Sequence, residues 1–198
     1  MIYRLLILVL LFSCSKDYQW DKITIDDAIR SIDEESNKLI LLDFYADTWG
    51  GCLRLEAETF SNKEIIEFSN KNFISIKLKP WDYQEDQEQL DKYGGGLIPL
   101  LVFLNSDGVE VDRLLGFYSS EDYIKKITNI FNDIDTFLSL KNSYNSGKKN
   151  TLILSKLSDK CKISMDIELC KNVYSDVIKS KELMSTQAVF KAELFFAK

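Results

Sequence analysis

Hydrophobic and polar positions change their period along the chain, and these changes predict helices and strands. Residues 24–32 carry apolar positions at helical spacing behind Thr24-x-x-Asp27, a pattern typical of a helix N-terminus. Residues 39–46 form a compact apolar run, which predicts a strand buried on both faces. Residues 74–79 alternate between apolar and polar, as in a half-buried strand.

Helical patterns fill the intervals between the predicted strands. One such segment carries Cys52, and the next follows Ser61-x-x-Glu64, a second capping-box pattern. A further helix is expected at residues 85–93. Helix and strand therefore alternate through the first half of the chain.

A hairpin and a last helix are expected next. Residues 100–104 form an apolar strand, Asn105-Ser106-Asp107-Gly108 is strong turn chemistry, and residues 109–113 alternate in polarity as a partner strand. Ser119 or Ser120 caps the helix that follows. This order of elements predicts an α/β fold, in which helices flank a mixed sheet.

Residues 135–198 have a different pattern. They contain no proline and a single glycine, Gly147, and the apolar positions of residues 169–178 follow helical spacing closely. We expect three or four short helices, which would form a small C-terminal all-helical extension.

The first residues have the pattern of an export signal. Arg4 precedes an unbroken apolar run at residues 5–12, which is too short to span a bilayer as a helix. Leu11-Phe12-Ser13-Cys14 resembles a bacterial lipobox, which implies that Cys14 is acylated and becomes the mature N-terminus. The alternatives are an uncleaved anchor or a plain signal peptide. By resemblance to Gram-negative sorting rules, Ser15 favours the outer membrane.

The chain therefore divides into four parts. We expect a lipoprotein signal peptide at residues 1–13, a tether at 14–19, an α/β domain at 20–134 and the helical extension at 135–198. Export implies an oxidising compartment, here the periplasm, where paired cysteines tend to be bridged.

Composition and charge exclude several function classes. The net charge is −6, so nucleic acid is not an expected partner. The chain has no histidine, which removes Ser-His-Asp and Cys-His nucleophile pairs and the commonest zinc ligand sets. No phosphate-binding glycine motif is present, and we predict no cofactor and no metal site.

Cys161 and Cys170 lie nine positions apart across an expected helix–turn–helix. In an oxidising compartment the pair is interpreted as a structural disulfide. A metal site there would lack ligands, because only these two cysteines are nearby and histidine is absent.

Several stretches together resemble one family. Residues from about 20 to 134 are similar to a thioredoxin-like domain of the exported, disulfide-interchange type. The matching stretches are Leu42–Ala46, Leu55–Phe60, Tyr93–Pro99, Val102–Leu104 and Asp107-Gly108. The resemblance implies the thioredoxin-like fold and a protein or peptide partner, either with or without a cysteine of its own.

The family's strand ends in W-C-x-x-C, and this chain departs from that pattern. Laid on the motif, Trp49 takes the place of the nucleophilic cysteine and Cys52 takes the place of the resolving one. An indole cannot ionise to a nucleophile or form a disulfide, so the two-cysteine cycle is not available within the motif. Any catalytic role of Cys52 would be residual.

The resemblance assigns roles to further residues. Asp43 matches the buried acid that helps to deprotonate the resolving thiol; alternatively it is solvated or caps an amide. Ile98-Pro99 matches the cis-proline dipeptide that hydrogen-bonds the substrate backbone, although the fold itself also requires this dipeptide. Trp49 is either an exposed platform for a peptide or a neutral loss of the cysteine.

Three functions remain open from the sequence. The first is a periplasmic thiol–disulfide protein with little or no turnover, using Cys52 and Asp43. The second is a non-catalytic module that binds peptide or protein at Trp49, Ile98 and Pro99, with the helical tail adding surface. The third is a structural role, in which the tail packs on a membrane partner.

Overall fold

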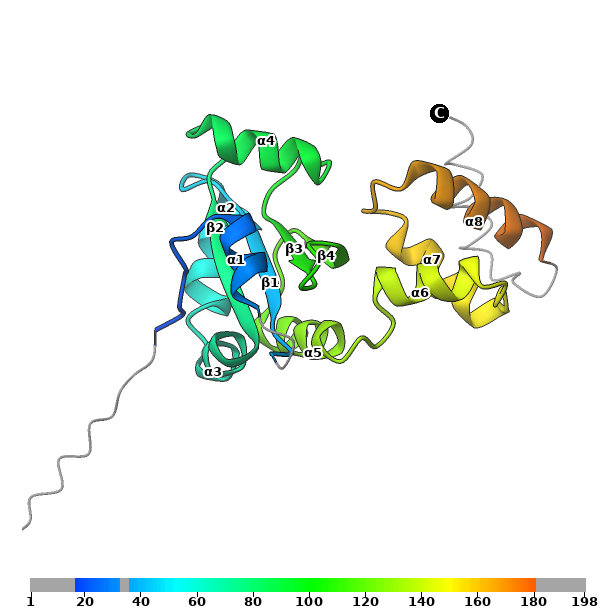
Figure 1. Cartoon of the computed structure of the whole chain (residues 1–198), viewed down its shortest axis with the longest axis horizontal. Coiled ribbons are helices and arrows are strands. Elements are labelled where there is room, and N and C mark those ends of the chain that lie inside the picture. The colour runs from blue at the N-terminus through cyan, green and yellow to red at the C-terminus, as the bar shows by residue number, and fades with distance from the viewer. Residues whose placement is uncertain (1–16, 33–35, 181–198) are drawn as a thin grey trace, which may run out of the picture.

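A computed structural model describes residues 17–32 and 36–180 (Figure 1). The expected signal peptide, Cys14 and half of the expected tether, residues 14–16, lie outside the described residues. Among the described residues, no helix is both long enough and apolar enough to cross a membrane.

A four-stranded mixed sheet forms the centre of the body. The strands are β1 (Leu39–Phe44), β2 (Phe73–Leu78), β3 (Leu100–Leu104) and β4 (Glu110–Leu115), in the order β2-β1-β3-β4. Strand β2 runs parallel to β1, whereas β3 is antiparallel to both β1 and β4. The predicted mixed sheet is confirmed.

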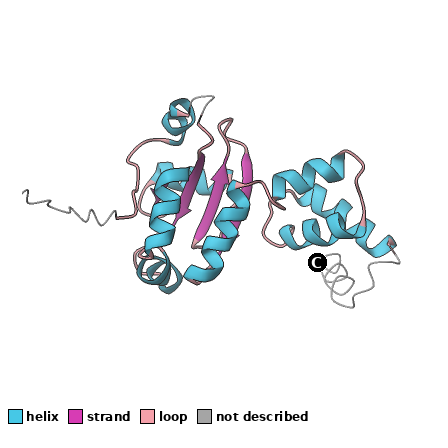
Figure 2. Ribbon diagram, turned by 90° about the horizontal axis from the view of Figure 1, so that it is seen from below, coloured by secondary structure: helices cyan, strands magenta, loops and turns pink. Residues whose placement is uncertain are grey.

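Helices cover both faces of this sheet (Figure 2). The helices of the body are α1 (Ile25–Ser31), α2 (Gly50–Arg54), the π-helix η1 (Leu55–Thr59), α3 (Lys63–Asn72), α4 (Gln84–Lys92) and α5 (Ser120–Phe131). One face of the sheet packs against α1 and α4, through Ala28 and Leu90. The other face packs against η1, α3 and α5, through Leu55, Ile65 and Ile127.

Side-chain caps explain where two of these helices begin. The Thr24 hydroxyl accepts a hydrogen bond from the Asp27 amide at 3.1 Å, and Ser119 caps α5 in the same way. The expected cap at Ser61 is wrong. Asn62 caps α3 instead, and the Ser61 hydroxyl donates to the Ala57 carbonyl, because the π-helical turn carries the preceding helix further.

The first described residues pack on the body, although residues 14–19 were expected to be a tether. The rings of Tyr18 and Trp20 stack 4.4 Å apart, and both contact Phe60. The Gln19 amide donates to Asn70 on α3. Burial of aromatic surface therefore holds this segment on the body.

The extension has its own core of three helices. These are α6 (Phe137–Asn145), α7 (Thr151–Lys160) and α8 (Ile167–Lys179), and α7 packs on both of the others. Leu157 and Val173 are fully buried between them. The predicted all-helical extension is confirmed over the described residues.

The extension docks on the edge strand β4. Lys160 of α7 pairs with Asp112, whose side chain is 1% exposed, and the Arg113 guanidinium donates to the Ile163 carbonyl at 3.4 Å. The expected alternation on this strand is therefore wrong. A bulge opposite Phe103 and Leu104 shifts the register, and the extension covers β4, so that Asp112 and Arg113 are both buried.

Candidate functional site

The turn after β1 holds Trp49 at the start of α2. The Trp49 amide donates to the Ala46 carbonyl, and the Trp49 carbonyl accepts from the Leu53 amide, which begins the helix. Trp49 is the N-cap residue, and its side chain makes no capping hydrogen bond. The indole is 56% exposed, so it lies open to a partner.

The Ile98-Pro99 peptide is cis and lies against this turn, as the family resemblance implied. A Cβ atom on Gly51 would lie 3.0 Å from Pro99 Cδ and 3.6 Å from Trp49 Cδ1. The absence of a side chain at position 51 therefore lets the proline ring approach the turn closely. The fold brings Trp49, Gly51 and Pro99 together.

Cys52 faces inward from α2 and is only 7% exposed. It is a free thiol. Burial raises its pKa, and the nearby Asp43 carboxyl adds to this effect, while a hydrogen bond involving the Ala46 backbone opposes it. The thiolate form is therefore disfavoured at neutral pH.

Asp43 lies on β1, in the buried interior below the turn that carries Trp49. Its side chain is 3% exposed, and its Oδ1 atom is buried without a hydrogen-bond partner among the described residues. Burial raises its pKa to about 7, with Lys77 lowering it and Glu56 raising it. This buried position agrees with the resemblance and differs from a solvated acid.

Lys77 is a site residue that the sequence reasoning missed. It lies opposite Asp43 in the β1–β2 register, and its Nζ is 2.5 Å from Glu56 Oε2. The same ammonium lies over the rings of Trp20 and Tyr45, at 4.5 and 4.8 Å from their centres. Only the strand register could have placed it here.

Two exposed aromatic residues share this end of the sheet. Trp81 and Tyr83 follow β2, and each is 61% exposed. Lys79, just before them, is paired with Asp47 in the turn after β1, so the two loops are joined. Because β1 and β2 are parallel, the loops that follow them lie at the same end of the sheet. The sequence reasoning did not single out either aromatic.

The remaining cysteines lie apart from this turn, in the core of the extension. Cys161 at the end of α7 and Cys170 on α8 are joined by a disulfide, with their Cα atoms 5.5 Å apart. Neither sulfur belongs to the turn that carries Cys52. Within the described residues, no group of three or more cysteine or acidic side chains is arranged to hold a metal ion.

Residues 25–131 match the model of the Thioredoxin-like domain, which is more than half of the chain. The chain belongs to this family. The thioredoxin-like resemblance seen in the sequence is thereby confirmed for the domain.

The curated relatives are thiol:disulfide interchange proteins. The chain is 28% identical over 108 residues to DsbD of Campylobacter jejuni (strain RM1221), a match that covers 54% of this chain and 19% of that protein. It is 30% identical over 105 residues to DsbD of Neisseria meningitidis serogroup A, covering 52% of this chain and 17% of that protein. The chain thus matches about a fifth of the length of these relatives.

A solved structure supports the same fold. The solution structure of a putative disulphide-isomerase from Bacteroides thetaiotaomicron is 26% identical to this chain. The match covers 59% of this chain and 94% of that one, with a TM-score of 0.51. The thioredoxin-like fold predicted from the sequence is confirmed.

Proposed function

We propose that this protein is a lipid-anchored, periplasmic thioredoxin-like protein of the thiol–disulfide exchange class whose site is degenerate. It binds extended polypeptide and has little or no catalytic turnover. One observation carries the proposal: Trp49 occupies the N-terminus of α2, where the family's motif has its nucleophilic cysteine.

The chemistry of exchange explains why this position matters. Exchange begins when a thiolate attacks a disulfide sulfur, and a helix N-terminus stabilises that thiolate through its free amides and its dipole. Trp49 cannot supply a thiolate. Cys52 lies further along the helix, where burial and the neighbouring Asp43 raise its pKa. The surviving thiol is therefore both shielded and weakly ionised.

The end of the sheet that carries Trp49 also has groups that can hold a peptide. Trp49 is exposed beside the cis-proline ring, and exposed aromatic residues are common anchors of interfaces. Neither the N–H nor the carbonyl of Ile98 bonds to another described residue. These free groups lie in the loop before the central strand β3, where they can pair with the backbone of an extended polypeptide.

A binding experiment tests this proposal. The native chain, Trp49→Ala and Leu152→Ala would be titrated with unfolded, reduced polypeptide and with extended synthetic peptides. Leu152 is a matched control, because it is 61% exposed but lies on α7, away from the turn. We expect Trp49→Ala to weaken binding about tenfold or more, since a buried aromatic anchor contributes at least 1.4 kcal/mol or so, and Leu152→Ala to leave it unchanged. Equal affinities for all three chains would overturn the proposal.

A second candidate function is single-thiol exchange by Cys52. The observation that favours it is the raised pKa of Asp43, which is close enough to influence Cys52 and could accept its proton near neutral pH. A disulfide-bonded substrate would then be trapped as a mixed disulfide on Cys52. Recovery of that adduct from the native chain, and its absence with Cys52→Ala, would establish this function.

The anchor is a separate part of the proposal and rests on sequence alone. Cys14 ends the lipobox-like segment Leu11–Cys14, and Ser15 favours sorting to the outer membrane. Cys14→Ala should release the protein from the membrane fraction or leave its precursor unprocessed. An unmodified Cys14 in the intact mass of a mature, unanchored protein would contradict the anchor.

A further inference from the structure

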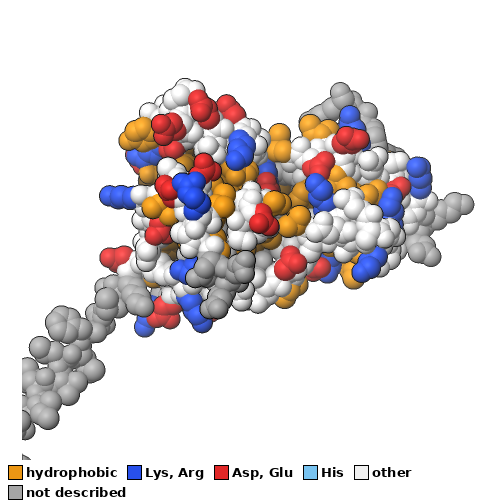
Figure 3. All heavy atoms as spheres, viewed as in Figure 1, with side chains coloured by type: hydrophobic (Ala, Val, Ile, Leu, Met, Phe, Trp, Pro, Cys, Tyr) orange, Lys and Arg blue, Asp and Glu red, His pale blue; other side chains and the backbone are white. Residues whose placement is uncertain are grey.

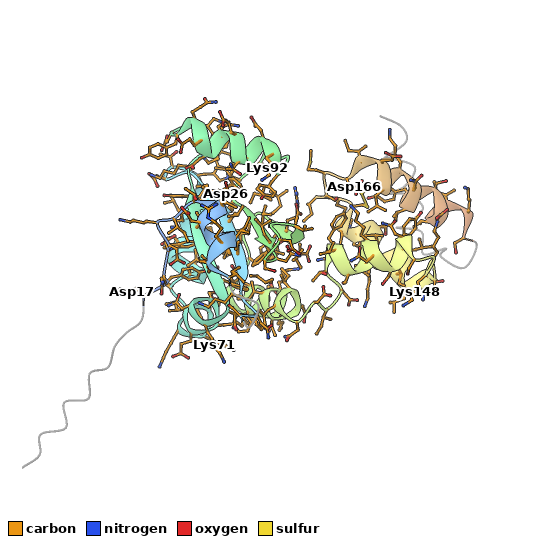
Figure 4. All side chains as sticks on the ribbon, in the orientation of Figure 1. Asp17, Asp26, Lys71, Lys92, Lys148 and Asp166 are labelled. Atoms are coloured by element: carbon orange, nitrogen blue, oxygen red, sulfur yellow. A yellow bond between two sulfur atoms is a disulfide. The ribbon has the colours of Figure 1, made fainter. Side chains whose placement is uncertain are left out.

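A cleft separates the thioredoxin-like body from the helical extension. Its walls are residues 94–97, which lead to the cis-proline, and residues 162–165, which join α7 to α8. Leu100 and Leu115 line its base, and its volume is about 170 Å³. Figure 3 shows a hollow lined by hydrophobic side chains between the two parts, and in Figure 4 Lys92 and Asp166 lie on opposite sides of it.

Glycine builds one wall of this cleft. A Cβ atom on Gly94, whose φ is +64°, would lie 2.3 Å from Met165 Cγ, so the missing side chain makes room for Met165. At Gly96, by contrast, a Cβ would meet nothing within 4 Å. The cleft therefore has a filled end at Gly94 and open space beside Gly96.

Covalent and polar contacts hold the opposite wall. The Cys161–Cys170 disulfide closes the loop that contains residues 162–165. Arg113 on β4 donates to the Ile163 carbonyl from below. This wall is thus tied both to the core of the extension and to the body.

The charged side chains that line the cleft are already paired with acidic residues. Arg113 is bound through two nitrogens by Glu110, at 2.6 and 2.5 Å, and Lys162 is paired with Asp159. Two apolar side chains remain exposed at the rim, Leu97 at 66% and Met165 at 51%. Such a surface favours a neutral, apolar occupant, because a charged one would be desolvated without a partner.

We propose that this cleft binds an apolar side chain of the same extended polypeptide that pairs with Ile98. The inference rests on the proposed peptide-binding function, and it adds a preference for an apolar residue at one position of the bound peptide. Leu97 belongs to the cleft and is next to Ile98 in the chain, so a strand on the Ile98 backbone runs past the cleft's rim. An apolar cavity of about 150 Å³ can hold a benzene ring, so 170 Å³ suits a leucine, methionine or phenylalanine side chain.

The period of an extended chain sets the spacing of this anchor. Alternate side chains of a strand point to the same side and are about 7 Å apart. The cleft should therefore bind the side chain of a single ligand residue, about two positions from the residue that pairs with Ile98. Moving a single leucine along an otherwise small and polar peptide should give one favoured position.

The experiment compares peptides of serine, threonine and alanine that carry one leucine, aspartate or serine at each position in turn. Each is titrated against the native chain, Leu97→Asp, Met165→Asp and the control Leu152→Asp. All three substituted residues are exposed, so their replacement should leave the fold intact. For the native chain and Leu152→Asp we expect leucine at the favoured position to bind at least about tenfold tighter than serine. Leu97→Asp and Met165→Asp should lose that preference while still binding the serine peptide.

A spectroscopic readout locates the contact directly. The ε-methyl resonance of Met165 should shift when the leucine peptide binds and stay in place with the serine peptide. Native binding that depends on Trp49 but shows no preference for leucine, or no shift at Met165, would overturn the cleft proposal alone. Failure of every peptide to bind the native chain would overturn the proposed function and the cleft with it.

Discussion

The thioredoxin-like body and the helical extension both bury cysteine sulfur, but they keep it in different chemical states. In the body, Cys52 is a free thiol, and the residue three positions before it is the exposed Trp49. In the extension, Cys161 and Cys170 are bonded to each other. Cysteine pairing in this chain thus supports the packing of the extension, whereas the turn that begins α2 contains a single sulfur.

The difference also shows which features of a thiol–disulfide exchange site are present without the nucleophilic cysteine. Asp43 is buried beneath the turn, the cis-proline lies against it, and the helix N-terminus is in place. Within the family motif W-C-x-x-C, Thr48 takes the place of the tryptophan and Trp49 takes the place of the nucleophilic cysteine. The body therefore has a site-like geometry without a thiol at the N-terminus of α2, whereas the two sulfurs of the extension are bonded to each other.

The largest expected effect concerns Asp43 in the body. An acid with a pKa of about 7 in the folded protein and 3.8 ordinarily takes up a proton on folding between those values. The contribution of Asp43 to the stability of the native chain therefore falls as the pH rises from 4 to 7. Since a tenfold change in proton affinity corresponds to about 1.4 kcal/mol, the stabilisation by Asp43→Asn should be roughly 3–4 kcal/mol greater at pH 8 than at pH 4.

Denaturant unfolding of both chains across this pH range measures that difference. Glu85→Gln is the control, because it removes a charge of the same sign from an exposed position on α4. This control measures the effect of removing one exposed negative charge, which is subtracted from the effect of Asp43→Asn. A pH-independent difference between the native chain and Asp43→Asn would mean that Asp43 is ionised in the folded protein.

The second effect concerns the disulfide in the extension. Closing a loop with a sequence separation of nine contributes about 2–3 kcal/mol in the chain-entropy model. The double substitution Cys161→Ala and Cys170→Ala should lower protection of α8 amides from hydrogen exchange by this amount and leave β1 protected. Equal loss of protection in β1 would show that the two parts unfold as one unit.

The smallest effect on stability is expected at Trp49. Its indole is exposed and makes no capping hydrogen bond, so Trp49→Ala should change the free energy of unfolding by less than about 0.5 kcal/mol. Thermal or denaturant unfolding checks this. A larger loss would mean that Trp49 supports the fold, which would weaken the case for a binding role.

Local patterns predicted much of the fold. The Thr24 and Ser119 caps and the four strands follow from short stretches of sequence, and the cis Ile98-Pro99 peptide follows from the family resemblance. The cap of α3 did not, because the π-helical turn before it shifts the boundary from Ser61 to Asn62. A π-helical insertion has no clear signal in a hydrophobic pattern.

Contacts between distant segments were beyond the sequence. Lys77 lies next to Asp43 only because β1 and β2 pair in one register. Asp112 and Arg113 are buried because the extension docks on β4. The polar and apolar pattern of that strand does not predict that another part of the chain covers it. Tyr18 likewise packs on Phe60, a contact between segments that are far apart in the sequence.

Turnover of a disulfide-bonded protein substrate separates a site that only binds from one that also exchanges disulfides. The native chain, Trp49→Cys and Cys52→Ala would be compared in the presence of a dithiol reductant. We expect background rates for the native chain and Cys52→Ala, and a clearly higher rate for Trp49→Cys, in which a thiolate at the helix N-terminus attacks and Cys52 resolves the mixed disulfide. Turnover by the native chain that disappears in Cys52→Ala would contradict a site without catalytic turnover.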